Sequence, residues 1–240
     1  MSKIRKWAWQ QIPSPVISEL LARSSNNVEG VVLDTEHAAF NDEVLYSCIQ
    51  VVSLTKRLPV VRLAEANLAK VRMCLDAGAR GLIFSTVESA GQALDIFKKT
   101  HYPHHRAPGV IGARGLGLTR DNRWGLDSLV TPPPILVAQI ETTRGVNNIK
   151  SIVQLNIFDY YMIGPYDLSS SLGDPGNFES QYFKDAIERV KCAVPDHKLA
   201  VHIPNNVQDQ LNKYESFGIM ALGMDTTFML EKTCEIFDHD

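Results

Sequence analysis

The sequence predicts an α/β protein folded as a single (β/α)8 TIM barrel. Short apolar runs alternate with amphipathic helical patterns along nearly all of the 240 residues. Most of these runs are continuously hydrophobic, as in parallel strands that helices cover on the outside. Eight strand–helix units within this length match one barrel, and no change in composition within residues 1–240 marks a second domain.

The predicted strands are the apolar runs at residues 5–11, 28–34, 58–63, 81–86, 135–141, 159–164, 199–203 and 219–225. The first helical pattern begins at Ser14-Pro15, an N-cap followed by a proline at the first helical position. The others cover residues 42–53, 67–77, 88–100, 144–155, 179–193, 205–217 and 226–237, and Gly78 and Gly218 are typical stop signals after two of them. The connection at 101–131 is long for a compact domain, which predicts a functional or mobile loop.

Composition limits the partners and the location. A net charge of −3 argues against nucleic acid or an anionic membrane as the main partner. The first ten residues lack a secretory signal, and no apolar run is long enough to cross a bilayer. The cysteines, Cys48, Cys74, Cys192 and Cys234, are far apart and are expected to be buried thiols rather than a disulfide frame or a zinc site. A cytoplasmic protein is therefore expected.

Charged residues stand at the ends of most predicted strands. In this fold the active site lies at the carboxyl ends of the strands, so these side chains should converge on one face. The alternative is that they are solvated strand ends and helix caps. The set consists of Asp34, Glu36 and His37 after the second strand, Arg62 after the third, Glu141 after the fifth, Asp167 after the sixth, His202 on the seventh and Asp225 on the eighth.

Glu141 and Asp167 are the predicted metal ligands. They follow adjacent predicted strands, so their carboxylates can meet above the barrel rim. Two carboxylates with open coordination positions suit a hard divalent ion such as Mg²⁺ or Mn²⁺. Asp167 could instead cap a helix beginning at Leu168, whereas Glu141 follows the apolar ILVAQI run and is harder to explain as a cap.

His37 and Arg62 are the predicted catalytic side chains. A carboxylate beside an imidazole fixes its tautomer and raises its basicity, so His37 with Asp34 and Glu36 is a candidate general base. A packed or solvated histidine is the alternative. Arg62 is a permanent cation suited to a carboxylate or an enolate oxygen, and the alternative is an ion pair with Glu36 or Glu65.

Three other segments are of interest. The segment 112–119, GARGLGLT, lacks the lysine and the spacing of a nucleotide motif, and it is expected to be a flexible loop over an anionic substrate. The histidines at 101, 104 and 105 are expected on the loop surface. A helix start after Gly164-Pro165 would present the backbone N–H groups of Tyr166 and Asp167 to a substrate carboxylate.

Six blocks of the sequence resemble, in order, the signature blocks of the HpcH/HpaI aldolase family. They are LDTEHAAF, PVVRL, GARGLGLTRDNRWG, VAQIETTRG, IGPYDLSSSLGDPGN and ALGMDTTFML, and they span nearly the whole chain. The family comprises metal-dependent aldolases for 4-hydroxy-2-oxo acids. Members are often hexamers of barrels that exchange the last helix between neighbours, so the resemblance implies a homo-oligomer here.

The resemblance also implies roles for the candidate residues. A divalent ion (Mg²⁺ or Mn²⁺, with Co²⁺ as a further candidate) would be bound by Glu141 and Asp167 and chelated by pyruvate, with Gln139 beside it. His37, supported by Asp34, would serve the acid–base step through a metal-bound water, and Arg62 would stabilise the enolate. Glu36 would hold these side chains in position without contacting the substrate. The substrates would be a small 2-oxo acid and an aldehyde.

Three departures from the family pattern concern the pocket wall. The segment YPHHRAPGVIGARG is several residues longer than expected, Tyr166 replaces a small residue, and Ser85 stands where a proline is common. These changes bear on substrate identity more than on the reaction. Three rival readings stay open at this point: an oxaloacetate-type decarboxylase on the same metal site, a non-catalytic carboxylate or sugar-acid binder, and a related CoA-thioester lyase.

Overall fold

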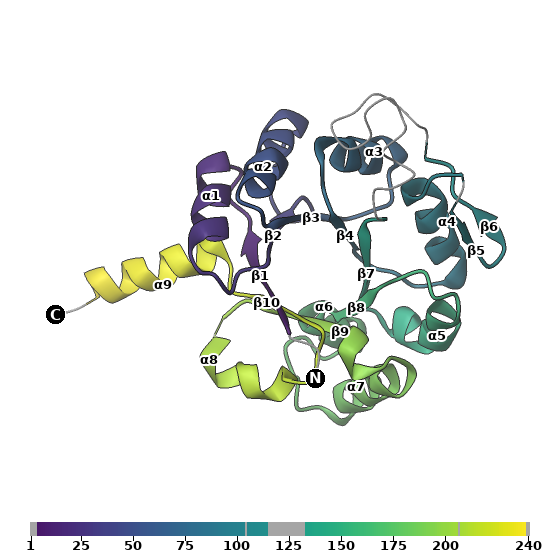
Figure 1. Ribbon diagram of the computed structural model, residues 1–240. Coiled ribbons are helices and arrows are strands. Elements are labelled where there is room, and N and C mark those ends of the chain that lie inside the picture. The colour runs from purple at the N-terminus through teal and green to yellow at the C-terminus, as the bar shows by residue number, and fades with distance from the viewer. Residues whose placement is uncertain (1–3, 104, 115–132, 206, 239–240) are drawn as a thin grey trace.

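The computed structural model describes residues 4–103, 105–114, 133–205 and 207–238. Within these residues a closed barrel of parallel strands forms, with the neighbour order β1-β10-β9-β8-β7-β4-β3-β2 (Figure 1). The predicted (β/α)8 barrel is confirmed. A short antiparallel hairpin, β5–β6, lies outside the barrel.

The barrel strands match the predicted runs to within a few residues. Five strands, β1, β4, β7, β8 and β10, end one to three residues before the predicted end of the run. The strands are β1 (Arg5–Gln10), β2 (Gly30–Asp34), β3 (Leu58–Leu63), β4 (Gly81–Phe84), β7 (Ile135–Ile140), β8 (Tyr160–Ile163), β9 (Leu199–Ile203) and β10 (Ile219–Leu222).

Strand alternation places the polar residues of the site. Successive side chains on a strand point to opposite faces, so every second residue faces the barrel interior. One buried cluster fills that interior, and it includes Val32, Val60, Val137 and Ala200. Two positions further along the same strands stand Asp34, Arg62, Gln139 and His202. Polar side chains therefore follow the interior core and surround the barrel at the carboxyl ends of the strands.

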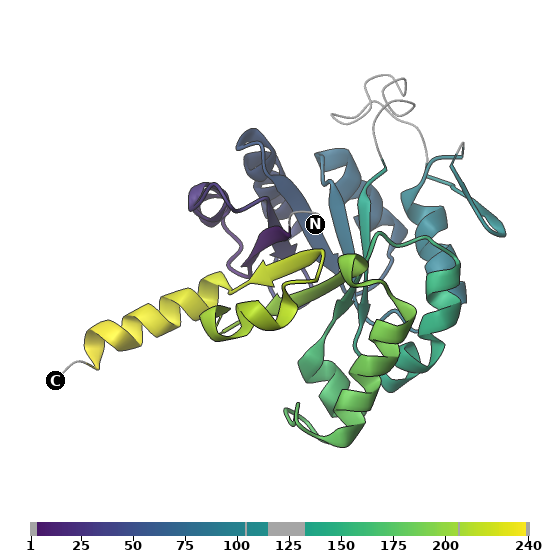
Figure 2. The same ribbon diagram turned by 60° about the horizontal axis from the view of Figure 1, so that its bottom comes forward.

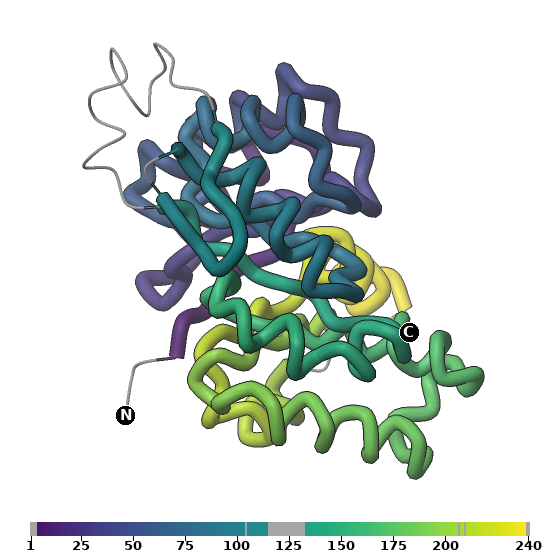
Figure 3. Tube along the Cα trace, turned by 90° about the vertical axis from the view of Figure 1, so that its right-hand side faces the viewer, coloured from purple at the N-terminus to yellow at the C-terminus, as the bar shows by residue number. Residues whose placement is uncertain are grey.

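Helices cover the outside of the barrel, as Figures 1 and 3 show. A second and larger buried cluster fills the layer between these helices and the strands. The helices are α1 (Pro15–Arg23), α2 (Asp42–Leu54), α3 (Leu68–Ala77), α4 (Ala90–Thr100), α5 (Thr143–Gln154), α6 (Pro165–Ser171), α7 (Gln181–Ala193), α8 (Val207–Gln210) and α9 (Asp225–Phe237).

The structure differs from the predicted elements in three places. The helix expected at 205–217 is broken into α8 and a 3-10 turn at Leu211–Tyr214. The helix α6 was predicted only as a helix start after Gly164-Pro165 and not over its full length, because its sequence PYDLSSS is too short and too polar to show a helical periodicity. The hairpin of β5 (Arg106–Ala107) and β6 (Val110–Ile111) lies in the segment expected to be a loop.

The predicted helix ends are partly correct. Gly78 ends α3 in the left-handed conformation, with φ of 106°, which costs a glycine no steric energy. Ser14 precedes α1 as predicted, but its side chain makes no cap hydrogen bond. Gly218 does not end a helix, since its N–H donates to Leu199 O at the start of β10.

The last helix, α9, extends away from the barrel instead of packing on it (Figure 2). Asp225, predicted at the end of a strand, is the first residue of this helix, and its carboxylate accepts the backbone N–H groups of Gln11 and Ile12 at 2.8 Å each. No helix in the described part of the chain has the length and apolar character needed to span a membrane. The four cysteines are free thiols; Cys48 and Cys74 are buried as expected, but Cys192 and Cys234 are exposed.

Candidate active site

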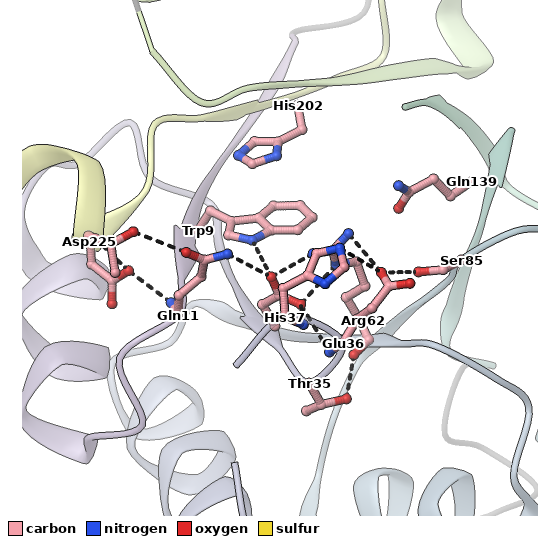
Figure 4. A network of polar contacts seen from close by, with 12 residues as sticks. Trp9, Gln11, Thr35, Glu36, His37, Arg62, Ser85, Gln139, His202 and Asp225 are labelled. Carbon is pink, nitrogen blue, oxygen red and sulfur yellow. Dashed lines mark hydrogen bonds and ion pairs between the residues drawn. The ribbon is translucent and has the colours of Figure 1, made fainter. Parts of the chain in front are cut away.

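A cavity of about 450 Å³ opens at the carboxyl ends of the strands. Six of the candidate residues line it: His37, Arg62, Gln139, Tyr166, Asp167 and His202. Its other walls come from residues that the sequence did not single out as site residues, among them Trp9, Gln11, Asn205, Met224 and Thr227. Figure 4 shows the polar network beside this cavity.

Asp34 and Arg62 form the buried centre of that network. The guanidinium donates to both carboxylate oxygens, with Nε–Oδ1 at 2.9 Å and Nη2–Oδ2 at 2.6 Å. Burial alone would raise the pKa of Asp34, but the hydrogen bonds and charge of Arg62 outweigh burial and lower it from 3.8 to about 2. The carboxylate also accepts from Trp9 Nε1, Gln11 Nε2 and the backbone N–H groups of Glu36 and His37.

The carboxylate beside the His37 imidazole belongs to Glu36, not to Asp34. Asp34 contacts His37 through the backbone N–H, so it holds the loop rather than the ring, and of the two acidic neighbours Glu36 is the one near the imidazole. Glu36 Oε2 lies 3.9 Å from His37 Nε2 and 2.8 Å from Arg62 Nη1. The same oxygen accepts the hydroxyl of Ser85 at 2.6 Å. The alternative of a Glu36–Arg62 ion pair is thus realised, and Arg62 still lines the cavity.

Glu141 is buried immediately after β7. Its Oε1 accepts the backbone N–H of Thr86 at 2.6 Å and the Thr86 hydroxyl at 2.7 Å, and its Oε2 accepts the side-chain amide of Gln139. Burial raises the pKa of Glu141; the Thr86 bonds oppose this effect, and the charges of Asp167 and Glu36 add to it. The two predicted metal ligands are therefore close enough to repel each other.

Asp167 lies in the first turn of α6, which Gly164 precedes as N-cap. The alternative that Asp167 caps a helix beginning at Leu168 is wrong, because the helix begins at Pro165, in agreement with the expected helix start after Gly164-Pro165. Tyr166 and Asp167 of this first turn line the cavity, and the first N–H groups of a helix have no intrahelical partner. The Tyr166 ring packs edge-on against Phe178, with ring centroids 5.0 Å apart.

The groups around Glu141 fit a hard cation. The side-chain oxygen of Gln139 is buried and has no hydrogen-bond donor among the described residues. Two neighbouring carboxylates and an unpartnered oxygen concentrate negative charge that a divalent ion would neutralise. No group of three or more His, Cys, Asp or Glu side chains suited to a metal occurs in the described part of the chain. Mg²⁺ is commonly held by only one or two carboxylates, with water and substrate oxygens completing its shell.

The remaining candidates lie elsewhere. His101 is buried and stacks on Phe97 at 4.1 Å between ring centroids, so it is a packing residue and not loop surface. His105 meets His101 edge-on. Residue 104 and most of the segment 112–119 lie outside the described residues. His202, in contrast, lines the cavity and stacks on Trp9.

The position of this cavity defines the class of protein: a barrel enzyme whose acidic and basic groups meet at the carboxyl ends of the strands. The chain belongs to the HpcH/HpaI aldolase/citrate lyase family, whose family model matches residues 20–231. It is an aldolase, a carbon–carbon lyase.

Individual relatives agree with this assignment. The chain is 31% identical to a 2-keto-3-deoxy-L-rhamnonate aldolase of Klebsiella pneumoniae, over 97% of this chain and 88% of the relative. It is 29% identical to a hydroxypyruvate/pyruvate aldolase of Delftia acidovorans, over 92% of this chain and 82% of the relative. A solved HpcH/HpaI aldolase/citrate lyase family protein from Burkholderia cenocepacia shares the fold, with a TM-score of 0.87 at 23% identity over 98% and 94% of the two chains.

Proposed function

We propose that this aldolase cleaves and forms 4-hydroxy-2-oxo acids, with Glu141 and Asp167 holding a divalent cation that pyruvate also contacts. Mg²⁺ and Mn²⁺ are the proposed ions, and Co²⁺ is a further candidate. The observation that carries the proposal is the buried Glu141 carboxylate beside Asp167, with the unpartnered Gln139 oxygen next to it. When bound, the cation supplies Lewis-acid polarisation of the keto oxygen.

Arg62 stabilises the negative charge that forms on pyruvate. Cleavage of the C3–C4 bond leaves its electron pair on the pyruvate fragment as an enolate. The guanidinium lines the cavity, and its hydrogen bonds to Asp34 and Glu36 fix its position before the reaction begins. A charge held in place needs no reorganisation as the enolate forms, which is the main source of electrostatic catalysis. We therefore assign Arg62 to substrate binding and enolate stabilisation.

His37 removes the proton from the C4 hydroxyl. Its ring lines the cavity while remaining largely exposed, so it can exchange protons with water between turnovers. An imidazole nitrogen accepts the proton, and the Glu36 carboxylate, 3.9 Å from Nε2, stabilises the imidazolium that results. In the condensation direction the same proton returns to the new C4 oxygen. Asp34 supports this step by holding the His37 backbone and Arg62.

The proposal is tested by measuring pyruvate release from a panel of 4-hydroxy-2-oxo acids, with and without EDTA. We expect activity to disappear with the chelator and to return with Mg²⁺, Mn²⁺ or Co²⁺. Glu141→Ala should be nearly inactive while retaining the circular dichroism spectrum of the folded protein. Oxaloacetate is assayed in parallel, because a decarboxylase would release pyruvate and CO₂ from it and would not act on the hydroxy acids. Activity that survives both the chelator and Glu141→Ala would refute the metal site.

We further propose that the barrel of residues 1–240 assembles into a homo-oligomer, in which α9 packs on a neighbouring copy. In α9 only Asp225 is buried, and Met229, Leu230, Ile236 and Phe237 are exposed apolar side chains. On α1, Val16 and Leu20 are also exposed. A barrel helix that leaves its own barrel (Figure 2) and exposes apolar residues fits an exchanged helix. A hexamer is the state that the family resemblance suggests.

A further inference from the structure

Another part of the cavity wall comes from β1, β9 and the segments that follow β9 and β10, away from Gln139 on β7. It is lined by Trp9 and His202 together with the uncharged polar side chains of Gln11, Asn205 and Thr227. Under the proposed function, pyruvate occupies the part of the cavity next to Gln139 and Asp167. The aldehyde part of the substrate must then lie against the remaining wall, which includes Trp9 and His202.

His202 is held in place by a stack of three side chains. Its ring lies parallel to the Trp9 ring, with centroids 4.0 Å apart and planes at 10°. The guanidinium carbon of Arg62 is 4.9 Å from the same indole, and Trp9 Nε1 donates to Asp34 at 3.2 Å. Figure 4 shows His202 and Arg62 on either side of Trp9. A ring clamped in this way presents its edge to a ligand at little entropic cost.

The hydrogen bond of His202 determines which ring nitrogen carries the proton. Nε2 lies 3.3 Å from the carbonyl oxygen of Gly223, and a carbonyl can only accept, so Nε2 carries the hydrogen. Burial and the charge of Arg62 lower the pKa of His202 from 6.5 to about 4, although the hydrogen bond to Gly223 and the charge of Asp34 oppose the shift. The ring is therefore neutral near pH 7. Its Nδ1 keeps a lone pair, and no described residue donates a hydrogen bond to it.

We propose that His202 is a specificity residue that accepts, at Nδ1, a hydrogen bond from a hydroxyl group on the aldehyde part of the substrate. The inference rests on the proposed function and names its second substrate class: uncharged hydroxyaldehydes. A hydroxyl is the matching donor for a neutral imidazole nitrogen, and the amide and hydroxyl groups of Asn205 and Thr227 can bind further hydroxyls at the rim.

The charges of the lining also favour an uncharged aldehyde. Among the described residues that line the cavity, Arg62 is the one permanent cation. Its guanidinium already binds Asp34 and Glu36 and faces the developing enolate. Few of its N–H donors are therefore left to bind a carboxylate or phosphate at the far end of the aldehyde. An aldehyde with a terminal carboxylate should therefore react more slowly than a hydroxyaldehyde of similar length.

The test is aldol addition of pyruvate, with Mg²⁺ at pH 7.5, to matched aldehydes that differ by one hydroxyl. The pairs are glycolaldehyde with acetaldehyde and lactaldehyde with propanal, and succinic semialdehyde serves as the charged aldehyde. For the wild type we expect the hydroxylated member of each pair to have the higher kcat/KM and succinic semialdehyde to be slower than the hydroxyaldehydes.

Two variants separate hydrogen bonding from packing. At position 202, the side-chain amide of Asn would lie near the place of the histidine Nδ1, whereas the side-chain amide of Gln would lie near the place of Nε2. His202→Gln can keep the bond to Gly223 O but offers no acceptor at Nδ1, so the hydroxyl preference should fall about tenfold, the scale of one hydrogen bond. His202→Asn should retain most of that preference. Thermal melts establish that both variants are folded.

Three outcomes are distinguishable. A wild type without a hydroxyl preference, or a His202→Gln variant that slows both members of each pair equally, would overturn the inference and leave His202 as a packing residue for Trp9. An enzyme that adds pyruvate to none of these aldehydes would contradict the proposed function itself. Loss of the preference in His202→Gln with its retention in His202→Asn supports the inference.

Discussion

Gly164 lies directly against the Glu141 carboxylate. A Cβ built on Gly164 would be 2.8 Å from Glu141 Oε2 and 2.9 Å from its Cβ, closer than real Cβ contacts come. The glycine therefore leaves room for the carboxylate at the point where β8 passes into α6, the helix that carries Asp167. The absence of a side chain at Gly164 thus allows the observed position of Glu141, one of the two proposed metal ligands.

The first prediction follows from this contact. Gly164→Ala should displace Glu141 and lower kcat/KM about a hundredfold, the scale reported for small misplacements of reacting groups. Gly91→Ala is the matched control, because a Cβ there meets only Ser89 Oγ at 3.9 Å. Steady-state kinetics and the Mn²⁺ concentration needed for half-maximal activity provide the measurement. Equal kinetics for the two alanine variants would show that the Glu141 position does not matter.

A second prediction concerns pH and the metal. The pKa of Glu141 is raised above its ordinary 4.5, so the group favours folding below pH 4.5, and this contribution is lost as the pH rises through the raised value. A cation binds the charged form and offsets that loss. The increase in Tm caused by Mn²⁺ should therefore grow from pH 5 to pH 8.

Calorimetry with and without Mn²⁺ measures this effect. At a hundred times Kd, binding stabilises the fold by about 2.7 kcal/mol, and for a chain of this size that is a Tm shift of roughly 5–10 °C. Glu141→Gln should abolish the shift, whereas Glu179→Gln, at an exposed carboxylate that pairs with Lys184, should retain it. A shift that is independent of pH, or one that persists in Glu141→Gln, would argue against this metal site.

A third prediction concerns the buried Asp34–Arg62 pair. The pKa of Asp34 is lowered from 3.8 to about 2, so its contribution to stability is present above pH 3.8 and is lost as the pH falls to about 2. The loss is about 2 kcal/mol. Arg62→Met leaves the carboxylate buried and unpaired, which should cost about 3–5 kcal/mol at pH 7.

In the Arg62→Met variant the pH dependence should reverse. Without Arg62, burial is expected to raise the pKa of Asp34, so lowering the pH from 7 to 4 should stabilise the variant relative to the wild type. Urea denaturation across this range measures both effects. Arg23→Met, which removes an exposed pair with Glu19, is the control and should cost less than about 1 kcal/mol. Parallel pH curves for Arg62→Met and the wild type would contradict the interpretation.

Strand periodicity explains how much of the site could be predicted. Arg62, Gln139 and Glu141 follow Val60 and Val137 of the interior core by two or four residues, and their place at the carboxyl ends of the apolar runs of β3 and β7 already indicates the site. The side-chain partners were less predictable, because they join separate strands. Ser85 reaches Glu36 across 49 positions of the sequence.

Trp9 and His202 show the same limit. Each occupies an apolar strand, β1 and β9, and neither sequence context indicates a stacked pair. Their contact exists because the barrel closes between the first and last strands, with β10 between them. The orientation of Asp34 toward Arg62 and the backbone of His37, rather than toward the imidazole, was also not readable from LDTEHA. A charge pattern indicates that groups meet but not which atoms do.

A fourth prediction uses Ser85. Its hydroxyl is one of the donors that hold Glu36 Oε2, so Ser85→Ala should reduce kcat several-fold with a smaller change in the KM for pyruvate. Ser85→Pro removes the hydroxyl and also the bond from the backbone N–H to Leu63 O at 3.0 Å. The proline variant should therefore lose stability as well as activity. A kcat for Ser85→Ala equal to that of the wild type would show that Arg62 alone positions Glu36.

The last prediction concerns α9, which should be exchanged between copies of the chain. Leu230 and Phe237 are 65% and 80% exposed, and burying a side chain of this kind contributes about 1.5–3 kcal/mol. Charging them in Leu230→Asp together with Phe237→Asp should therefore dissociate the assembly, and sedimentation velocity should then show the 26.7 kDa monomer. Tyr182→Asp on α7, at a side chain that is 73% exposed, is the control and should leave the assembly intact. Leu20→Asp tests whether the exposed apolar side chains of α1 receive α9 from a neighbouring copy, and it should then weaken the same assembly without altering α9. A wild type that sediments as a monomer would refute the exchange, because α9 would then expose its apolar residues to water with no partner to cover them.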